Sequence, residues 1–216
     1  MQIEVRAVPP FAKNGYVVGC PATGEAIVID PGDEVDQLIE VVTRHAWTVR
    51  YIMLTHAHLD HIAGCIEAKA AWPVPLILHR DDHFLYERAV QQGVAFGVRM
   101  RPQPPIDGWF DEQSRWRFGH CQVTAHHTPG HSPGQVCLQI GDDDDDAGRD
   151  LFVGDTLFAG SIGRTDLPGG DHEVLLNSIR DVLIPLGDAC RVHPGHGPST
   201  DIATERRTNP FLMSIA

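Results

Sequence analysis

The chain has 216 residues, of which 42% are apolar and 21% are charged, and these proportions exclude disordered, collagen-like and coiled-coil classes. The length predicts a single domain over residues 1–216, and the net charge of −12 argues against a nucleic-acid partner. The N-terminus lacks the continuous apolar stretch of a signal peptide, and no apolar run is long enough to cross a bilayer. We therefore expect a cytoplasmic protein without a membrane partner.

The first half of the chain predicts strands that alternate with helices. Apolar residues between Gly and Pro positions indicate strands at 3–7, 16–18, 26–29, 49–54 and 76–78. Helical spacing of apolar residues predicts helices that include Val35 to Val42, Ile62 to Ala71 and Asp81 to Gln92, with an irregular stretch through Pro105. This alternation is typical of an α/β fold.

The second half predicts fewer helices. Strands are expected at 122–125, 135–140 and 151–153, with a short strand at 191–192 and a helix from Asp171 to Leu183. The aspartate run from Asp142 to Asp146 lies between two predicted strands, so we interpret it as a solvated loop.

Potential metal ligands gather where predicted strands end. The strand at 49–54 is followed at once by four of them: His56, His58, Asp60 and His61. Three later motifs supply another three: His131 in Thr-Pro-Gly-His, Asp155 in Gly-Asp-Thr and His196 in Pro-Gly-His-Gly. Imidazole and carboxylate donors without thiolate suit zinc, and they also accept iron or manganese. Zinc is the default prediction.

With these seven residues in this order, the sequence resembles the metallo-β-lactamase superfamily. The resemblance implies an αββα sandwich with two divalent metal ions at one edge of the sheets. It assigns one ion to His56, His58 and His131, the other to Asp60, His61 and His196, and makes Asp155 the bridge. A shared carboxylate and a shared hydroxide would offset the repulsion between two neighbouring cations. Asp60 would also act catalytically by orienting that hydroxide.

Two further stretches, 154–158 and 161–168, look like the short, single-domain hydroxyacylglutathione hydrolase (glyoxalase II) branch. This implies hydrolysis of a small-molecule thioester, S-lactoylglutathione or a related acylglutathione. Asp155 disfavours the zinc β-lactamases, which mostly have Cys there, and His58 disfavours the di-iron flavoproteins, which usually have Glu. Nuclease branches prefer a basic surface.

Other functions stay open. The Gly-Arg-Thr-Asp stretch at 163–166 is shared with persulfide dioxygenases, which would use His56, His131 and Asp155 for a single iron. Lactonase or another hydrolase activity of the superfamily is a further alternative, and a non-enzymatic metal-binding role is the last.

Several residues near these motifs have two interpretations. Asp30, in Ile-Asp-Pro-Gly, either hydrogen-bonds a metal ligand or simply forms a turn, and Arg164 either pairs with a substrate carboxylate or ties its loop to Asp166. We interpret Cys65 as a buried thiol, and Arg206 and Arg207 as surface charges of a helix. The remaining histidines are expected at the surface or in satisfied loop positions.

Overall fold

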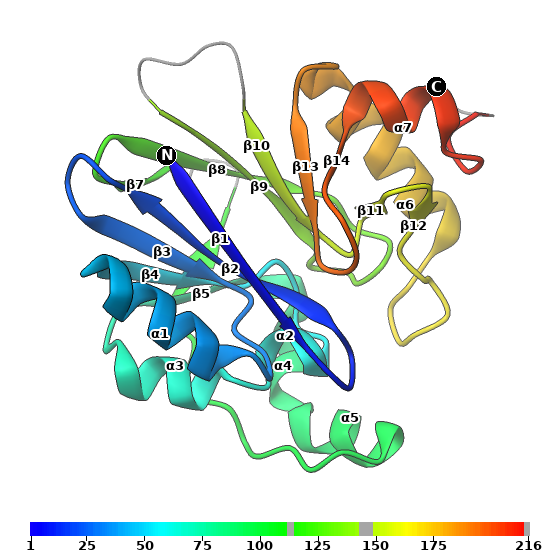
Figure 1. Ribbon diagram of the computed structural model, residues 1–216. Helices are drawn as coiled ribbons and strands as arrows, with labels where there is room; N and C mark the ends of the chain where they lie inside the picture. Colours follow the sequence, from blue (N-terminus) through cyan, green and yellow to red (C-terminus); the bar gives the residue numbers. More distant parts are fainter. Residues whose placement is uncertain (112–114, 143–148, 214–216) are drawn as a thin grey trace.

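The computed structural model describes residues 1–111, 115–142 and 149–213, in which two mixed sheets lie face to face (Figure 1). The first sheet is built in chain order from β1 (Gln2–Val8), β2 (Lys13–Cys20), β3 (Glu25–Ile29), β4 (Thr48–Met53), β5 (Leu76–His79) and β6 (Gly108–Phe110). Its first three strands are antiparallel, and β3 to β6 run parallel.

The second sheet has the order β14 (Thr200–Asp201), β13 (Arg191–Pro194), β10 (Asp150–Gly154), β9 (Val136–Asp142), β8 (Cys121–His127), β7 (Arg115–Phe118). Only β10 and β13 pair in parallel within this sheet. A small hairpin, β11 (Leu157–Phe158) and β12 (Ser161–Ile162), follows β10.

Helices cover the outer face of each sheet (Figure 1). The first sheet carries α1 (Val35–His45), α2 (Leu59–Ile62), α3 (Cys65–Ala71), the 3-10 turn Arg80–Asp82, α4 (His83–Glu87) and α5 (Ala89–Phe96). The second carries α6 (His172–Ser178), its π-helical continuation Ile179–Leu183, the 3-10 turn Ile184–Leu186 and α7 (Ile202–Thr208).

Alternation along the strands divides the core into layers. On β2, Val17 packs with the helices of the first sheet, whereas Val18 packs between the two sheets. On β10, Phe152 faces the space between the sheets and Leu151 faces α6. The result is the predicted αββα sandwich, in which parallel strands bring their carboxyl ends to a common edge.

Two predicted helices are interrupted. The helix expected over Ile62 to Ala71 breaks at Gly64, whose N–H bonds the Pro31 carbonyl 3.0 Å away. A Cβ on Gly64 would lie 2.3 Å from the Gly32 oxygen, so this close approach needs glycine.

The helix expected over Asp81 to Gln92 is divided at Arg88 and reaches Phe96, where Gly97 ends it with a positive φ of 68°. The prediction was wrong in placing 93–96 in an irregular stretch. The helix expected over Asp171 to Leu183 begins at His172, because the Asp171 side chain accepts from the Val174 N–H as its cap.

The remaining predictions of local structure have mixed outcomes. Strands β6 and β7 were not predicted. Cys65 is fully buried as expected, and Arg206 and Arg207 are exposed on α7. The aspartate run, apart from Asp142 at the end of β9, lies outside the described residues. Within those residues, no helix has the length and apolar character that crossing a bilayer requires.

Candidate metal centre

The segment after β4 carries four of the seven predicted ligands, His56 and His58 in the loop before α2 and Asp60 and His61 on α2, and its loop is held by buried carboxylates. The Thr55 N–H donates to Asp30 at 2.7 Å, and the Ala57 N–H donates to Asp82 at 2.8 Å. A buried loop has no neighbouring strand to satisfy its backbone, so these carboxylates supply the missing acceptors. The loop is thereby fixed in the shape that presents its imidazoles.

The first group of ligands is His56, His58 and His131, all buried. The Nε2 atom of His131 lies 3.2 Å from His56 Nε2 and 2.8 Å from His58 Nδ1. Ligands around one tetrahedral ion lie roughly 3.3 Å apart, so the three nitrogens have suitable spacing. Burial lowers the pKa of His58 to about 3 and that of His56 well below its usual range, which keeps both imidazoles neutral, as metal binding requires.

The second group is Asp60, His61 and His196. Asp60 Oδ2 lies 3.1 Å from His196 Nε2 and 3.7 Å from His61 Nε2. Burial opposes the ionisation of Asp60, but the neighbouring His61 and His196 outweigh it and lower its pKa to about 2. This group therefore combines an anionic oxygen with two imidazole nitrogens.

Asp155 lies between the two groups. Its Oδ1 is 3.4 Å from His61 Nε2, while its Oδ2 is 3.5 Å from His131 Nε2 and 3.6 Å from His196 Nε2. Both Asp155 Oδ1 and His61 Nε2 are buried without a hydrogen-bond partner. Buried polar atoms rarely go unsatisfied, and an orphaned donor set of this kind fits cations at the shared centre.

The charge around His61 supports the same interpretation. Burial lowers the pKa of His61, but the carboxylates of Asp60, Asp155 and Asp30 outweigh it and raise the pKa to about 10. Three anionic groups thus surround one ring and favour a positive charge there. A second cation would satisfy them in place of the proton.

Hydrogen bonds behind the ligands select which nitrogen faces the centre. Asp30 Oδ2 lies 2.9 Å from His61 Nδ1 and accepts from Thr55 Oγ1 at 2.6 Å. His131 Nδ1 lies 2.7 Å from the Arg164 carbonyl. Each bond places the proton on Nδ1 and leaves Nε2 for a metal. Asp30 therefore hydrogen-bonds a predicted metal ligand, His61, which is the first of the two interpretations of Asp30 given above.

Asp82 is a supporting residue that sequence reasoning missed. Besides Ala57 it accepts from Ser132 Oγ at 2.9 Å and from the Gly134 N–H, so one carboxylate joins the loops of His58 and His131. Its neighbours in sequence give no signal, because the partners come from 25 to 52 positions away.

A buried ion pair and an amide were also missed. Lys13 Nζ lies 2.6 Å from Glu34 Oε1, with both side chains nearly inaccessible, and it also donates to the Asp30 carbonyl. On α5, Gln92 donates to the Ala57 carbonyl at 2.9 Å and accepts from the Leu59 N–H at 3.1 Å. Gln92 therefore fixes α5 against the ligand loop.

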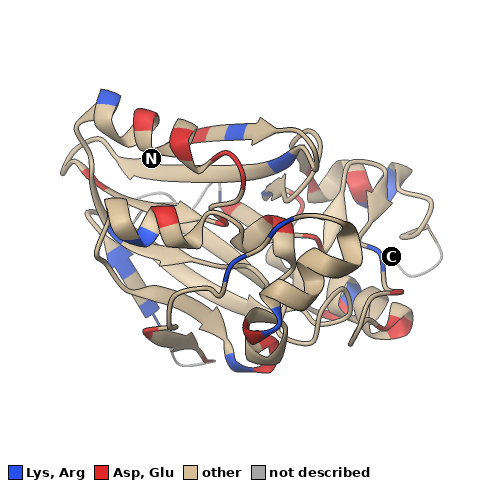
Figure 2. Ribbon diagram, turned by 90° about the horizontal axis from the view of Figure 1, so that it is seen from below, with Lys and Arg blue, Asp and Glu red and all other residues tan. Residues whose placement is uncertain are grey.

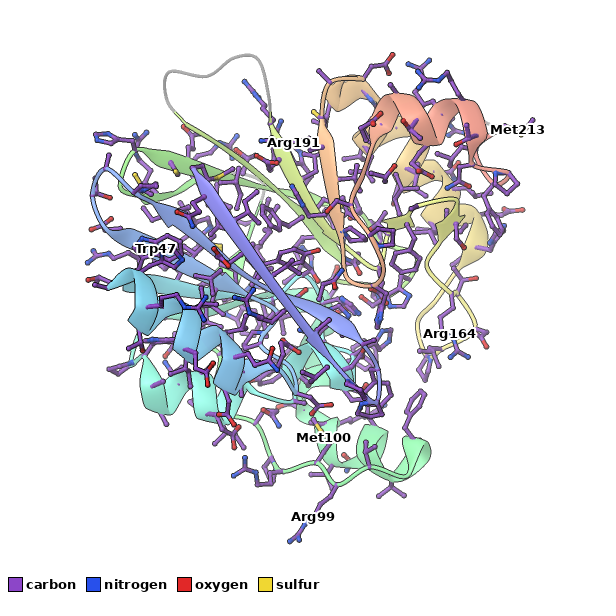
Figure 3. All side chains as sticks on the ribbon, in the orientation of Figure 1. Trp47, Arg99, Met100, Arg164, Arg191 and Met213 are labelled. Atoms are coloured by element: carbon purple, nitrogen blue, oxygen red, sulfur yellow. The ribbon has the colours of Figure 1, made fainter. Side chains whose placement is uncertain are left out.

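The ligands open into a cavity of about 510 Å³. Its walls come from α5 on one side and from the loop between β12 and α6 on the other, and Figure 3 shows Arg164 on that loop. The Arg164 guanidinium forms two bonds to Asp166, at 2.7 and 2.8 Å, so it ties its own loop in this structure. Apolar surface from Phe96, Leu167 and Pro168 completes the cavity.

Comparison with known families now decides the relationship. The family model of the metallo-beta-lactamase superfamily matches residues 8–196. The chain belongs to this superfamily. It is 36% identical over 216 residues to hydroxyacylglutathione hydrolase GloC of Haemophilus influenzae, with 99% of each chain covered. It is also 35% identical to the probable metallo-hydrolase YqgX of Bacillus subtilis, with 97% of this chain and 96% of that protein covered.

Solved structures show the same relationship. Superposition on the crystal structure of the B3 metallo-beta-lactamase BLEG-1 gives a TM-score of 0.88 at 35% sequence identity and covers 98% of this chain and 99% of that one. A di-iron-bound form of TTHA1623 gives a TM-score of 0.84 and 38% identity over 97% of this chain and 100% of that one. ETHE1 from Myxococcus xanthus gives 0.79 at 25% identity, covering 97% and 84%.

Proposed function

We propose that this superfamily member is a binuclear metal-dependent hydrolase that cleaves a thioester, S-lactoylglutathione or a related acylglutathione. The observation that carries the proposal is the position of Asp155, whose two oxygens face His61 on one side and His131 and His196 on the other. Two ions held this way would supply an ionised water near neutral pH and polarise the carbonyl under attack.

The chain itself supplies orientation. Asp60 lines the cavity and stays ionised, with a pKa of about 2, so its carboxylate can accept a hydrogen bond from the attacking water and aim it. The departing thiolate has a conjugate acid with pKa near ~8.5, so its expulsion needs no strong proton donor. A thioester therefore suits the site better than an amide, because expulsion of an amine would require a strong proton donor.

The relatives support this choice without deciding the substrate. GloC carries the name of a hydroxyacylglutathione hydrolase, and residues 154–158 and 161–168 resemble that branch. Zinc is the proposed default metal. Iron or manganese would fit the same nitrogen and oxygen donors, and TTHA1623 was solved in a di-iron-bound form.

The test is elemental analysis of the purified protein combined with hydrolysis assays. We expect close to two metals per chain, hydrolysis of S-lactoylglutathione, and loss of both after chelation. A lactone, a phosphodiester and a β-lactam serve as comparison substrates, the last because BLEG-1 is named a β-lactamase. Cleavage of one of these without any thioester hydrolysis would overturn the substrate assignment.

A mononuclear iron persulfide dioxygenase is the second candidate, because the Gly-Arg-Thr-Asp stretch at 163–166 is shared with that class. It would use His56, His131 and Asp155 and leave the Asp60 group without a role. One iron per chain together with oxygen consumption on glutathione persulfide would favour it over the hydrolase.

A further inference from the structure

Arg88 is a cation on the wall of the candidate active-site cavity that the chemistry described so far does not use. It lies between α4 and α5, is exposed, and lines the same cavity as His58 and Asp60. Among the described residues no carboxylate forms an ion pair with it, although seven other arginines have one: Arg6, Arg50, Arg101, Arg164, Arg180, Arg191 and Arg206. Its guanidinium lies over the Phe84 ring, 5.8 Å from the ring centroid, a contact that leaves the charge without a carboxylate. In a chain of net charge −12, an arginine without a carboxylate beside a catalytic cavity is available for an anionic ligand.

Contacts within α5 fix the place of Arg88 relative to the reacting centre. The Gln92 N–H bonds the Arg88 carbonyl at 2.9 Å, so the two residues are one helical turn apart on the same face. The Gln92 side chain bonds the backbone of Ala57 and Leu59, on either side of His58. The Arg88 backbone therefore lies about one turn of helix, roughly 6 Å along the axis, from Gln92, the residue that contacts the ligand loop.

The opposite wall does not offer a comparable charge. Arg164 faces α5 across the opening, but Asp166 neutralises its guanidinium through two hydrogen bonds. The surface between them is apolar, from Phe96 and Leu167. The cavity thus combines a polar reacting end, an apolar middle and one uncompensated cation.

Resting on the proposed thioester hydrolysis, we infer that Arg88 is the residue that selects substrates whose thiol half carries a carboxylate. The thioester carbonyl would lie at the metal centre, the thiol half would run along α5, and its carboxylate would pair with the guanidinium. A planar guanidinium binds a carboxylate through two parallel hydrogen bonds, which gives direction as well as attraction.

The experiment compares S-lactoylglutathione with its diethyl ester, which keeps the same thioester and peptide skeleton but lacks the carboxylate charges. We expect the metal-loaded protein to prefer the charged substrate by about tenfold in kcat/KM. Arg88→Gln should reduce this preference to about twofold or less by raising KM for the charged substrate. Its kcat, its metal content and its hydrolysis of the diester should stay as in the wild type.

Arg99→Gln is the matched control. Arg99 is exposed, also lacks an ion pair among the described residues, and lines a neighbouring groove rather than the active-site cavity. Figure 3 shows its side chain pointing away from the cavity below α5. Arg99→Gln removes the same charge from the molecule as Arg88→Gln does, but outside the active-site cavity, so it should leave the substrate preference unchanged.

Titration calorimetry with free glutathione supplies a readout that does not depend on turnover. Arg88→Gln should weaken its binding about tenfold, and Arg99→Gln should not change it. Equal hydrolysis of both substrates, or an unchanged preference in Arg88→Gln, would overturn the inference while leaving thioester hydrolysis intact. Failure of every variant to cleave either substrate would instead overturn the proposed function, and unchanged glutathione binding in Arg88→Gln would then dismiss Arg88 separately.

Discussion

The two sides of the active-site cavity differ in how their side chains are held. On the metal side, the two supporting carboxylates are buried and hydrogen-bonded: Asp30 contacts His61, and Asp82 holds the loop of His58. On the α5 side, Arg88 and Phe96 are exposed, the Arg88 guanidinium contacts only the Phe84 ring among the described residues, and α5 is tied to the metal loop through Gln92. On the proposed function, we expect the buried side to fix the reacting geometry and the exposed groups of the α5 side to govern substrate choice.

The largest effect is expected at the bridge. Asp155→Ala should lower occupancy at the second site and reduce thioester turnover by more than about a hundredfold, because it leaves two cations without the shared carboxylate. Asp155→Asn keeps the shape and should retain some metal while losing most turnover. Elemental analysis and rate measurements test both, with Cys65→Ala as a buried control that changes neither. Full metal content and normal rates in Asp155→Ala would show that Asp155 is not a bridge.

The next effect is expected behind His61. In Asp30→Asn the side-chain amide N–H would face the Nδ1–H of His61, so His61 loses the hydrogen bond that directs its Nε2 to the centre. Metal affinity should fall by about 10–100-fold, as measured by competition with a chelator. Asn tolerates the positive φ of 50° at this position, so the backbone is preserved. The exposed neighbour gives the control, Asp33→Asn, and equal affinity in the two variants would contradict the supporting role of Asp30.

Asp82 tests whether the two imidazole loops are coupled. Asp82 Oδ2 accepts from Ala57 and Ser132 and Oδ1 accepts from Gly134, so Asp82→Asn replaces one of these acceptors by an amide N–H and should lower the free energy of unfolding by about 1–3 kcal/mol. Activity should fall with it, because His58 and His131 lose their common support. Denaturant titration and kinetic assays measure both, against the exposed Asp81→Asn. A stable variant with reduced activity would separate positioning from folding.

Asp150 begins β10, at the end of that strand opposite to Asp155, and its substitution tests how far the pairing of β10 with β13 depends on a buried carboxylate. Burial raises its pKa, but hydrogen bonds from His193 and Arg191 outweigh this and lower it. A lowered folded-state pKa contributes stability that is complete above the unfolded value near ~3.9 and is lost as the pH falls through the folded value. Asp150→Asn should therefore cost about 1–2 kcal/mol between pH 5 and 7, and the difference from wild type should shrink below about pH 4.

Denaturant titrations across this pH range supply the measurement for Asp150. The control is Asp181→Asn, which removes an equally short pair with Arg180 at an exposed site and should leave the free energy of unfolding essentially unchanged. A difference between Asp150→Asn and wild type that persists unchanged at pH 3 would contradict the assigned pKa direction.

The smallest effect is expected at Arg164. Because Asp166 already neutralises this exposed side chain, Arg164→Gln should change kcat/KM for S-lactoylglutathione by less than about threefold. Steady-state kinetics of this variant beside Arg88→Gln would sharpen the contrast between the two walls. A larger loss in Arg164→Gln than in Arg88→Gln would assign substrate pairing to Arg164 instead.

The sequence predicted the parts of the site that depend on short-range pattern. Ligands such as His56 and His196 follow strands within a few residues, and the alternating or helical spacing of apolar residues marked most elements of the sandwich. It missed Asp82, Gln92 and the Lys13–Glu34 pair, because their partners lie far away in the chain and nothing in their neighbours signals them. The break at Gly64 was missed for the same reason, since it answers a contact with Pro31.

The described charged residues do not form one large patch in the view from below. Figure 2 shows basic and acidic positions interspersed over the ribbon. Individual pairs, rather than one large charged face, therefore decide where an anionic ligand can be held.

Each ligand group takes two side chains from the segment 56–61 after β4 and a third from a loop that follows a strand of the second sheet, namely His131 after β8 in one group and His196 after β13 in the other. During synthesis the N-terminal part emerges first and can begin to fold before the rest of the chain is available. A nascent chain therefore presents His56, His58, Asp60 and His61 as an unfinished half. His196 comes into place only when β13 has paired with β10, so on the proposed two-metal site we expect metal loading late in folding. Once bound, the ions would join the ends of a loop of well over a hundred residues and act as a reversible cross-link between the sheets.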